Sequence, residues 1–208
     1  KVINKEAQKK NVKLFKYQSE WKIVAKTDKK FNIKILDKNY EVPIPKLFGD
    51  HQLYNSALAL AVAKTVNGFK LNDKKIFQGI YETFWPARMQ RLNQGKLKDI
   101  IGDNFEIWLD GGHNIHASEM LLKNMKSWEK DNLFMIFGMI KGKEHKDFLK
   151  NLLPYIKSLQ IIPIKNHNHI SADQIKLDFN DFSHLVRSEK TIEDSLKYLK
   201  DHNLNGKI

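Results

Sequence analysis

One short stretch, residues 109–114 with the sequence LDGGHN, constrains the fold of this chain more than any other. Before it, residues 105–109 (FEIWL) are mostly apolar and predict a buried strand. After it, Ala117, Leu121 and Met125 recur at helical spacing and predict an amphipathic helix. The order strand, glycine turn, helix is typical of an α/β domain.

The two glycines of this turn let the backbone bend sharply and let a ligand come close. Asp110 falls at the carboxyl end of the predicted strand, and His113 lies beside the helix start, where Asn114 fits the N-cap position. Ligands bind at the carboxyl ends of strands in open α/β sheets, and free amides at a helix start favour a phosphate or carboxylate. Asp110 and His113 are therefore candidate ligand-binding residues. An ordinary turn with both side chains in solvent is the alternative.

The chain of 208 residues, 41% of them hydrophobic, is long enough for one large domain or two small ones. It contains no cysteine, which excludes a disulfide framework and a thiolate metal site. His167 and His169 have no nearby carboxylate in the sequence to complete a metal site, so no metal ligand is predicted. No apolar run approaches the roughly 20 residues of a membrane span, and no signal peptide is visible. We therefore expect a cytoplasmic protein that does not contact a membrane.

The formal charge of +12 is the feature that most favours nucleic-acid binding. Of the 36 basic residues, however, only Arg88, Arg91 and Arg187 are arginine, the side chain that binds phosphates and bases as a fork. The lysines are scattered along the chain, and a positive field also attracts anionic substrates. We therefore expect no nucleic-acid partner. A non-catalytic, lysine-rich nucleic-acid-binding module is the alternative, which salt-dependent binding to random DNA or RNA would reveal.

The first 45 residues predict a small antiparallel sheet of short strands between polar turns. These strands are predicted at residues 12–15, 20–26, 31–36 and 40–44. A helix follows at residues 56–63, with Asp50 as its cap, and a second helix at residues 72–80. The first helix is small and apolar nearly all round, so we expect it to be buried. Asn55 would then need a partner, either a backbone group or the edge of an adenine ring.

Pro86 ends the second helical pattern and stiffens the chain, so we place a domain boundary at about residues 83–86. Beyond it, apolar runs alternate with helical patterns, which predicts a mostly parallel sheet flanked by helices. Further strands are predicted at residues 133–137, 159–164, 182–186 and 206–208, and further helices at residues 145–153, after Ser171 and at residues 191–199. Arg88, just past the boundary, is placed to reach a ligand held between domains. A surface salt bridge is the alternative.

Residues 138–144 (GMIKGKE) invite comparison with a phosphate-binding loop but do not match one. The pattern GxxxxGK[ST] needs one more residue between the glycines and a hydroxyl after the lysine, where this chain has Glu144. These residues are therefore predicted to form a loop between a strand and a helix. A ligand role for Lys143 or His145 stays open.

Three motifs follow one another along the chain: GxHQxxN at residues 49–55, WPAR at residues 85–88 and LDGGHN at residues 109–114. Together they resemble the folylpolyglutamate synthase and dihydrofolate synthase family, a branch of the Mur ligase superfamily. Two positions depart from the family pattern. Ala87 stands where many members have glycine, and Ile115 and His116 stand where a proline is usual.

The resemblance implies that residues 85–208 form a Rossmann-like carboxyl-terminal (glutamate ligase) domain, cut short at its end. Residues 1–84 would be the carboxyl-terminal part of the central ATPase domain. The phosphate loop and the Mg²⁺ ligands would then lie upstream, in the missing amino-terminal ATPase part of the parent chain. This fragment alone would be inactive, and the parent enzyme is expected to be a monomer.

The resemblance also implies an activity and roles for four residues. The family joins L-glutamate to dihydropteroate or to folylpolyglutamate with ATP, through an acyl phosphate, and releases ADP and phosphate. Asn55 would contact the adenine, and Asp110 would hold the ribose hydroxyls. Arg88 would reach the ATP phosphates, and His113 would order the nucleotide or the incoming glutamate, so that both would serve catalysis. The resemblance leaves open whether dihydropteroate, folylpolyglutamate or both accept the glutamate. Another Mur-type amino-acid ligase of cell-wall synthesis is the alternative.

Overall fold

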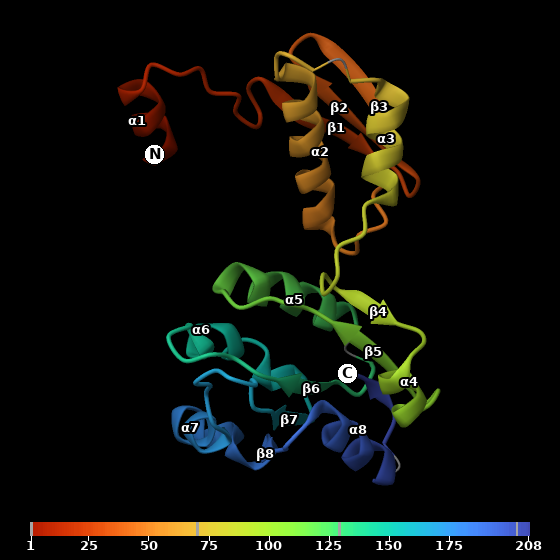
Figure 1. Ribbon diagram of the computed structural model, residues 1–208, viewed down its shortest axis with the longest axis vertical. Helices are drawn as coiled ribbons and strands as arrows, with labels where there is room; N and C mark the ends of the chain where they lie inside the picture. The colour runs from red at the N-terminus through yellow and green to blue at the C-terminus, as the bar shows by residue number, and fades with distance from the viewer. Residues whose placement is uncertain (1, 70, 129, 203) are drawn as a thin grey trace. The chain divides into compact units, whose positions relative to one another are not determined.

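Figure 1 shows the computed structural model of the chain, in which residues 2–69, 71–128, 130–202 and 204–208 are described. The chain folds into two compact units, unit 1 (Lys1–Trp85) and unit 2 (Pro86–Ile208), and each has its own sheet and hydrophobic core. Helices and strands are mixed in both units, which confirms the predicted α/β class. None of the described helices is long and apolar enough to cross a membrane.

Unit 1 is built on a small antiparallel sheet, as predicted. Its strands are β1 (Trp21–Lys26), β2 (Lys30–Ile35) and β3 (Lys38–Pro43), in the order β1-β2-β3. Alternate residues of β2, namely Phe31, Ile33 and Ile35, are buried on one face of this sheet. Two helices, α2 (Asp50–Thr65) and α3 (Asp73–Glu82), pack against that face (Figure 1).

The predicted strand at residues 12–15 is wrong, and an unpredicted helix, α1 (Val2–Lys9), precedes it. Val12 and Phe15 are exposed, and no described strand pairs with this segment. Its alternation of apolar residues and lysine is typical of a strand, but a strand is stable only when a neighbour completes its hydrogen bonds. The sequence of α1 consists largely of lysine, glutamate, glutamine and alanine, which favour a helix.

Only one face of α2 is buried, so the prediction that this helix is buried all round is wrong. Leu53 and Leu60 are buried against the sheet. Tyr54, Leu58 and Val62, spaced four residues apart on another face, are each about half exposed. The physical reason is geometric, because a three-stranded sheet can cover one side of a helix and no more.

The helices α2 and α3 of unit 1 are capped differently at their N-termini. The prediction that Asp50 caps α2 is wrong. Asp50 is the first residue of α2, and Gly49 occupies the N-cap position without a side-chain hydrogen bond. The Asp50 carboxylate instead accepts a hydrogen bond from Lys26 Nζ, at 2.9 Å. Asn72 caps α3, and its Oδ1 accepts a hydrogen bond from the amide of Lys74.

Unit 2 contains the mostly parallel sheet. Its strands are β4 (Gln90–Leu92), β5 (Phe105–Leu109), β6 (Phe134–Phe137), β7 (Ser158–Ile161), β8 (Val186–Ser188) and β9 (Gly206–Lys207). They form two three-stranded groups, β4-β5-β9 and β6-β7-β8, in which only β4 runs antiparallel to its neighbour. A parallel bridge between Leu133 and Lys207 joins the two groups. The last strand in the sequence, β9, therefore lies between β5 and β6.

Helices cover both faces of this sheet. They are α4 (Lys96–Ile101), α5 (Ile115–Ser127), α6 (His145–Leu149), α7 (Ala172–Asp178) and α8 (Ile192–Asp201), with the 3₁₀ helices η1 (Leu153–Tyr155) and η2 (Asn180–Leu185). One core joins alternate strand residues such as Leu159 to α5, α6 and α7. The other joins Phe105 and Phe134 to α4 and α8. Burial on both faces is what a mostly parallel sheet requires.

Two predicted elements of unit 2 need correction. The strand predicted at residues 182–186 is mostly η2, and β8 begins only at Val186. Phe179, Phe182 and Leu185, spaced by three, pack against the core, and this spacing fits the three residues per turn of a 3₁₀ helix. The helix predicted at residues 145–153 ends at Leu149 and is followed by η1. The strand predicted at residues 206–208 is confirmed as β9.

Candidate functional site

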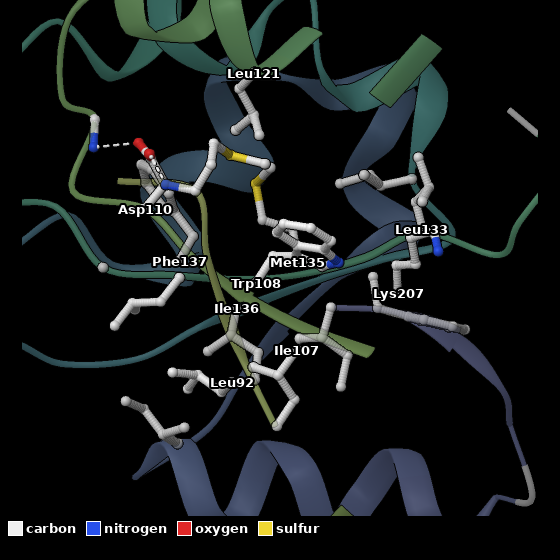
Figure 2. Close-up of a pocket in the computed structure, with 18 of the residues that line it drawn as sticks. Leu92, Ile107, Trp108, Asp110, Leu121, Leu133, Met135, Ile136, Phe137 and Lys207 are labelled. Atoms are coloured by element: carbon white, nitrogen blue, oxygen red, sulfur yellow. Dashed lines mark hydrogen bonds between the residues drawn. The ribbon is translucent and has the colours of Figure 1, made fainter. Parts of the chain in front are cut away.

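Asp110 links two loops of unit 2. It follows the last residue of β5, and both of its carboxylate oxygens accept backbone hydrogen bonds (Figure 2). Oδ1 accepts from the amide of Gly112 at 2.7 Å, and Oδ2 accepts from the amide of Met89 at 2.9 Å. The carboxylate thereby ties residues 86–89, which we call the Arg88 loop, to residues 110–113, which we call the glycine turn.

The Arg88 loop has a strained backbone. Ala87 and Met89 have φ angles of 55° and 46°, in the left-handed region that disfavours any residue with a Cβ. The carbonyl of Ala87 accepts a hydrogen bond from the amide of Gly111 at 2.9 Å. The left-handed conformation at position 87 also gives a reason for the glycine that is usual there in the family that the motifs resemble.

The glycine turn is too crowded for a side chain at Gly112. A Cβ on Gly112 would lie 2.7 Å from Ala117 Cβ and 2.8 Å from Asp110 Oδ1. A Cβ on Gly111 would lie 3.8 Å from Arg88 Nη1, so the Arg88 guanidinium extends alongside this turn. Gly112 therefore lets the turn pack against the start of α5 and the Asp110 carboxylate.

The start of α5 adjoins the glycine turn, as the sequence predicts. Asn114 is the N-cap, and its Oδ1 accepts a hydrogen bond from the amide of Ala117 at 3.0 Å. His113 is exposed, and its Nδ1 lies 3.2 Å from the carbonyl oxygen of Gly111. When Nδ1 carries the proton it donates to this carbonyl, and Nε2 is then a free acceptor. Amides in the first turn of a helix attract anions.

Arg88 differs from the other two arginines of the chain. Arg91 Nη2 pairs with Glu106 at 2.9 Å, and Arg187 Nε pairs with Glu189 at 3.6 Å, as ordinary surface ion pairs do. No carboxylate pairs with Arg88 among the residues that the structure describes, and Arg88 is exposed. The structure thus brings Arg88, Asp110 and the glycine turn together, with an unpaired guanidinium at the surface.

Asn55, the fourth predicted site residue, lies on α2 in unit 1. It is exposed, so its predicted burial is wrong, because the face of α2 that carries it is not covered by the sheet. Its Nδ2 donates to Gln52 Oε1 at 3.1 Å. Gln52 Nε2 in turn lies 2.9 Å from His51 Nε2, so three residues of the GxHQxxN motif contact one another.

His145 belongs to a cluster of charged and polar side chains around Asp178. Its Nε2 lies 2.7 Å from Asp178 Oδ2, and Lys146 Nζ lies 2.7 Å from Asp178 Oδ1. The Asp178 side chain is only 8% exposed, and its hydrogen bonds with Lys146 and then His145 lower its pKa to about 2. His145 therefore holds α6 to α7, whereas Lys143 is exposed.

The loop at residues 138–144 carries a glycine for packing. A Cβ on Gly138 would lie 3.3 Å from the carbonyl oxygen of Ile162, so this glycine lets β6 pass close to the chain after β7. Elsewhere, His169 Nδ1 lies 3.2 Å from the carbonyl oxygen of His167. Within the described ranges no group of three histidine, aspartate or glutamate residues is arranged to hold a metal ion.

An apolar cavity of about 350 Å³ lies beside Asp110 (Figure 2). Trp108, Leu121, Met135 and Phe137 are among the residues that line it, and Lys207 lies at its far side. The side chain of Met89, which is buried, also enters this cavity. The cavity offers packing for the Arg88 loop and few polar groups for a ligand.

Sequence reasoning missed the contacts made by Met89 and Gln90. Gln90 Oε1 accepts a hydrogen bond from the amide of Ala87 at 3.0 Å. The signal that could have found it is local, because amide side chains often bind a turn amide three residues away. The contact between Met89 and Asp110 has no such signal, since it joins residues 21 positions apart.

The fold is that of known ligases. Residues 88–204 match the family model described as Mur ligase, glutamate ligase domain. The dihydrofolate synthase/folylpolyglutamate synthase of Bacillus subtilis (strain 168) is 26% identical over 126 residues, which are 59% of this chain and 27% of that protein. The chain is also similar to the solved structure of E. coli FolC in complex with DHPP and ADP, with a TM-score of 0.77 and 21% identity over 99% of this chain and 45% of that one.

A second solved structure gives the same fold. It is that of a bifunctional folylpolyglutamate synthase/dihydrofolate synthase with Mn, AMPPNP and L-glutamate bound, with a TM-score of 0.77 and 20% identity over 98% of this chain and 45% of that one. The chain thus spans less than half of the length of these solved relatives. Because the family model covers more than half of the chain, the chain belongs to the Mur ligase family, by way of the glutamate ligase domain that residues 88–204 match.

Proposed function

We propose that this chain is part of an ATP-dependent ligase that adds L-glutamate to dihydropteroate, to folylpolyglutamate, or to both. The observation that carries the proposal is the unpaired, exposed Arg88 guanidinium held beside the glycine turn and the start of α5, in a chain of the glutamate ligase family. The relatives named dihydrofolate synthase and folylpolyglutamate synthase support the folate branch over cell-wall ligases. They also favour an enzyme over a nucleic-acid-binding module.

The same relatives support a domain assignment, which we propose here. Residues 85–208 would be the glutamate ligase domain, and residues 1–84 would be the end of the ATPase domain of a longer parent enzyme. We further propose that the parent enzyme acts as a monomer in the cytoplasm, where ATP and glutamate are available. Its partners would be small molecules and its own amino-terminal part.

Arg88 is proposed to bind the phosphates of ATP. ATP supplies the phosphoryl group that activates the substrate carboxylate as an acyl phosphate, which the amine of glutamate then attacks. A guanidinium stays charged and binds phosphate oxygens as a fork, so Arg88 would stabilise the negative charge that develops during transfer. We assign the ligands of Mg²⁺ to the rest of the parent enzyme, as the family resemblance implies.

The glycine turn is proposed to hold the rest of the nucleotide and the glutamate. Each oxygen of the Asp110 carboxylate has a second lone pair beyond its backbone hydrogen bond, and these lone pairs can accept from the ribose hydroxyls. His113 would order the nucleotide or the incoming glutamate through its free ring nitrogen. Asn55, with its amide exposed on α2, would contact the adenine.

The parent enzyme tests the proposal. Glutamate-dependent release of ADP is expected with dihydropteroate, folylpolyglutamate or both as the acceptor. Arg88→Ala should lower kcat by on the order of a hundredfold, and Arg88→Lys should restore it only in part, because a point charge cannot replace the fork. Arg187→Ala is the control, since Arg187 lies in a surface ion pair. ADP release that depends on another amino acid would favour a different Mur-type ligase.

The isolated 208-residue chain gives a second test. It contains no GxxxxGK[ST] sequence, so we expect no ATP hydrolysis above background with Mg²⁺, dihydropteroate and glutamate present. Turnover by the isolated chain would contradict the assignment of the phosphate loop to another part of the parent enzyme.

A further inference from the structure

The backbone on either side of Arg88 is held by hydrogen bonds from two neighbouring strands. The amide of Ala87, before it, donates to Gln90 Oε1 at 3.0 Å. The amide of Met89, after it, donates to Asp110 Oδ2 at 2.9 Å. Gln90 is the first residue of β4, and Asp110 follows the last residue of β5, with which β4 pairs.

This arrangement is needed because the loop is strained on both sides of Arg88. A residue with a Cβ in the left-handed region persists there only when its surroundings hold it, and such residues concentrate at functional sites. Ala87 and Met89 are both in this region, whereas Arg88 itself is exposed. The Gly111 amide also holds the carbonyl of Ala87, so the loss of either amide contact would loosen this loop without unfolding it, and the guanidinium would move with it.

We propose that Gln90 is a positioning residue that sets the direction of the Arg88 side chain by fixing the amide of Ala87. Asp110 fixes the opposite side through Met89. Gln90 touches no substrate in this proposal and acts only through Arg88. Its effect on catalysis therefore rests on the proposed function, whereas its effect on the loop does not.

Two substitutions at Gln90 separate the hydrogen bond from the volume of the side chain. Gln90→Met keeps the length and removes the carbonyl acceptor, whereas Gln90→Glu keeps an acceptor oxygen at the same place. In the parent enzyme, we expect Gln90→Met to lower kcat about tenfold with a smaller change in KM, because a misplaced catalytic group affects the transition state most. Gln90→Glu should restore most of kcat. Gln94→Met, at an exposed position beyond β4, is the matched control.

A double-mutant cycle shows whether Gln90 acts through Arg88. On an Arg88→Ala background, Gln90→Met should cause no further loss of kcat, because the group that it positions is gone. The same tenfold loss on both backgrounds would mean that Gln90 stabilises the fold or contacts substrate, and would overturn the proposal. Unchanged kcat in Gln90→Met with Arg88 present would overturn it as well.

Amide hydrogen exchange at residue 87 of the parent enzyme gives a readout without catalysis. Gln90→Met should speed exchange of the Ala87 amide several-fold, and Gln90→Glu should return it toward the wild-type rate. Unchanged exchange in Gln90→Met would overturn the proposal even if kcat fell. If Arg88→Ala left kcat intact, the proposed role of Arg88 would fail, and the positioning role with it, whereas the exchange result would still show whether Gln90 holds the loop.

Discussion

At the scale of the residue, Asp110 combines two tasks in one carboxylate. Its oxygens already accept hydrogen bonds from the amides of Gly112 and Met89. We propose that they also accept hydrogen bonds from the ribose hydroxyls. The two tasks make different demands. The backbone contacts stabilise the loops in the absence of any ligand, whereas a ribose contact affects only the nucleotide.

Comparing ATP with 2′-deoxy-ATP in Asp110→Asn of the parent enzyme distinguishes these tasks, because the amide group that replaces one oxygen disturbs a backbone contact for both nucleotides alike. We expect a higher KM for ATP and weaker discrimination against 2′-deoxy-ATP, because the analogue lacks one of the hydroxyl groups that donate hydrogen bonds to the carboxylate. A hydrogen bond to a charged acceptor contributes about 1.5–3 kcal/mol, which corresponds to roughly a tenfold to hundredfold change in affinity. Steady-state kinetics with both nucleotides measures it. His113→Ala should leave the discrimination between the two sugars intact, and wild-type discrimination in Asp110→Asn would leave Asp110 as an anchor of the loops alone.

Ala87 gives a prediction about stability. A φ of 55° costs a residue with a Cβ about 1–2 kcal/mol, whereas glycine adopts it freely but loses more entropy on folding. Ala87→Gly should therefore raise the free energy of unfolding of unit 2, by up to about 1 kcal/mol, as measured by urea denaturation. Ala59→Gly, at an exposed position inside α2, is the control and should lower the stability of unit 1 by about 1 kcal/mol. A loss of stability in both variants would contradict the strain at position 87.

At the scale of the element, the Asp178 cluster holds two short helices together. The side chains of His145 and Lys146, at the start of α6, reach Asp178 at the end of α7. Both helices are shorter than the roughly 12 residues that an isolated helix needs to be stable, so their contacts with the rest of the unit stabilise them.

The stability of unit 2 should therefore depend on pH through Asp178. Because its pKa is lowered from 3.8 to about 2, its stabilising effect is complete above pH 4 and is lost as the pH falls toward 2. The difference in the free energy of unfolding between wild type and Asp178→Asn should shrink by about 2 kcal/mol from pH 5 to pH 2. Urea denaturation at each pH measures it. Asp201→Asn, an exposed change in α8, should show no such trend, and a pH-independent difference for Asp178→Asn would contradict the ion-pair cluster.

The elements that the sequence predicts well are those with local signals. The apolar run of β5, the helical spacing of α5 and the capping side chain of Asn114 all lie within about twenty residues of one another. The burial of α2 and the strand at residues 182–186 were predicted wrongly, because burial and pairing depend on neighbours far away in the sequence. The same limit applies to the site, since the bond between Asp110 and Met89 depends on β4, which the sequence did not reveal.

At the scale of the whole molecule, β9 completes the sheet of unit 2 from its centre. The amide of Trp108 donates to the carbonyl of Ile208 at 2.7 Å, and the amide of Ile208 donates to the carbonyl of Glu106 at 2.9 Å. On the other side, the amide of Lys207 donates to the carbonyl of Asn132 at 2.8 Å. Lys207 Nζ also donates to Glu106 Oε2 and lowers the pKa of that carboxyl group.

Removal of residues 206–208 should therefore destabilise unit 2 strongly. Each backbone hydrogen bond contributes about 0.5–1.5 kcal/mol, so we expect a loss of roughly 3–5 kcal/mol. Tryptophan fluorescence during urea denaturation measures it, because Trp108 and Trp128 lie with ring centres 5.0 Å apart in this unit. Lys207→Ala keeps the backbone hydrogen bonds, removes the side-chain contacts with Glu106, Asp131 and the Trp128 ring, and should cost much less. A deletion variant as stable as wild type would show that β5 and β6 hold together without β9.

The place of β9 also determines the order in which the chain can fold during synthesis. The strands of unit 1 are consecutive and joined by short turns, so they can pair with one another before unit 2 is made. In unit 2, β9 pairs with β5 across about a hundred residues. Until residues 206–208 are made, β5 and β6 have no strand between them, and their exposed edges can pair with other chains. We therefore expect unit 2 to fold slowly and only after residue 208 has been synthesised, with aggregation as the competing outcome.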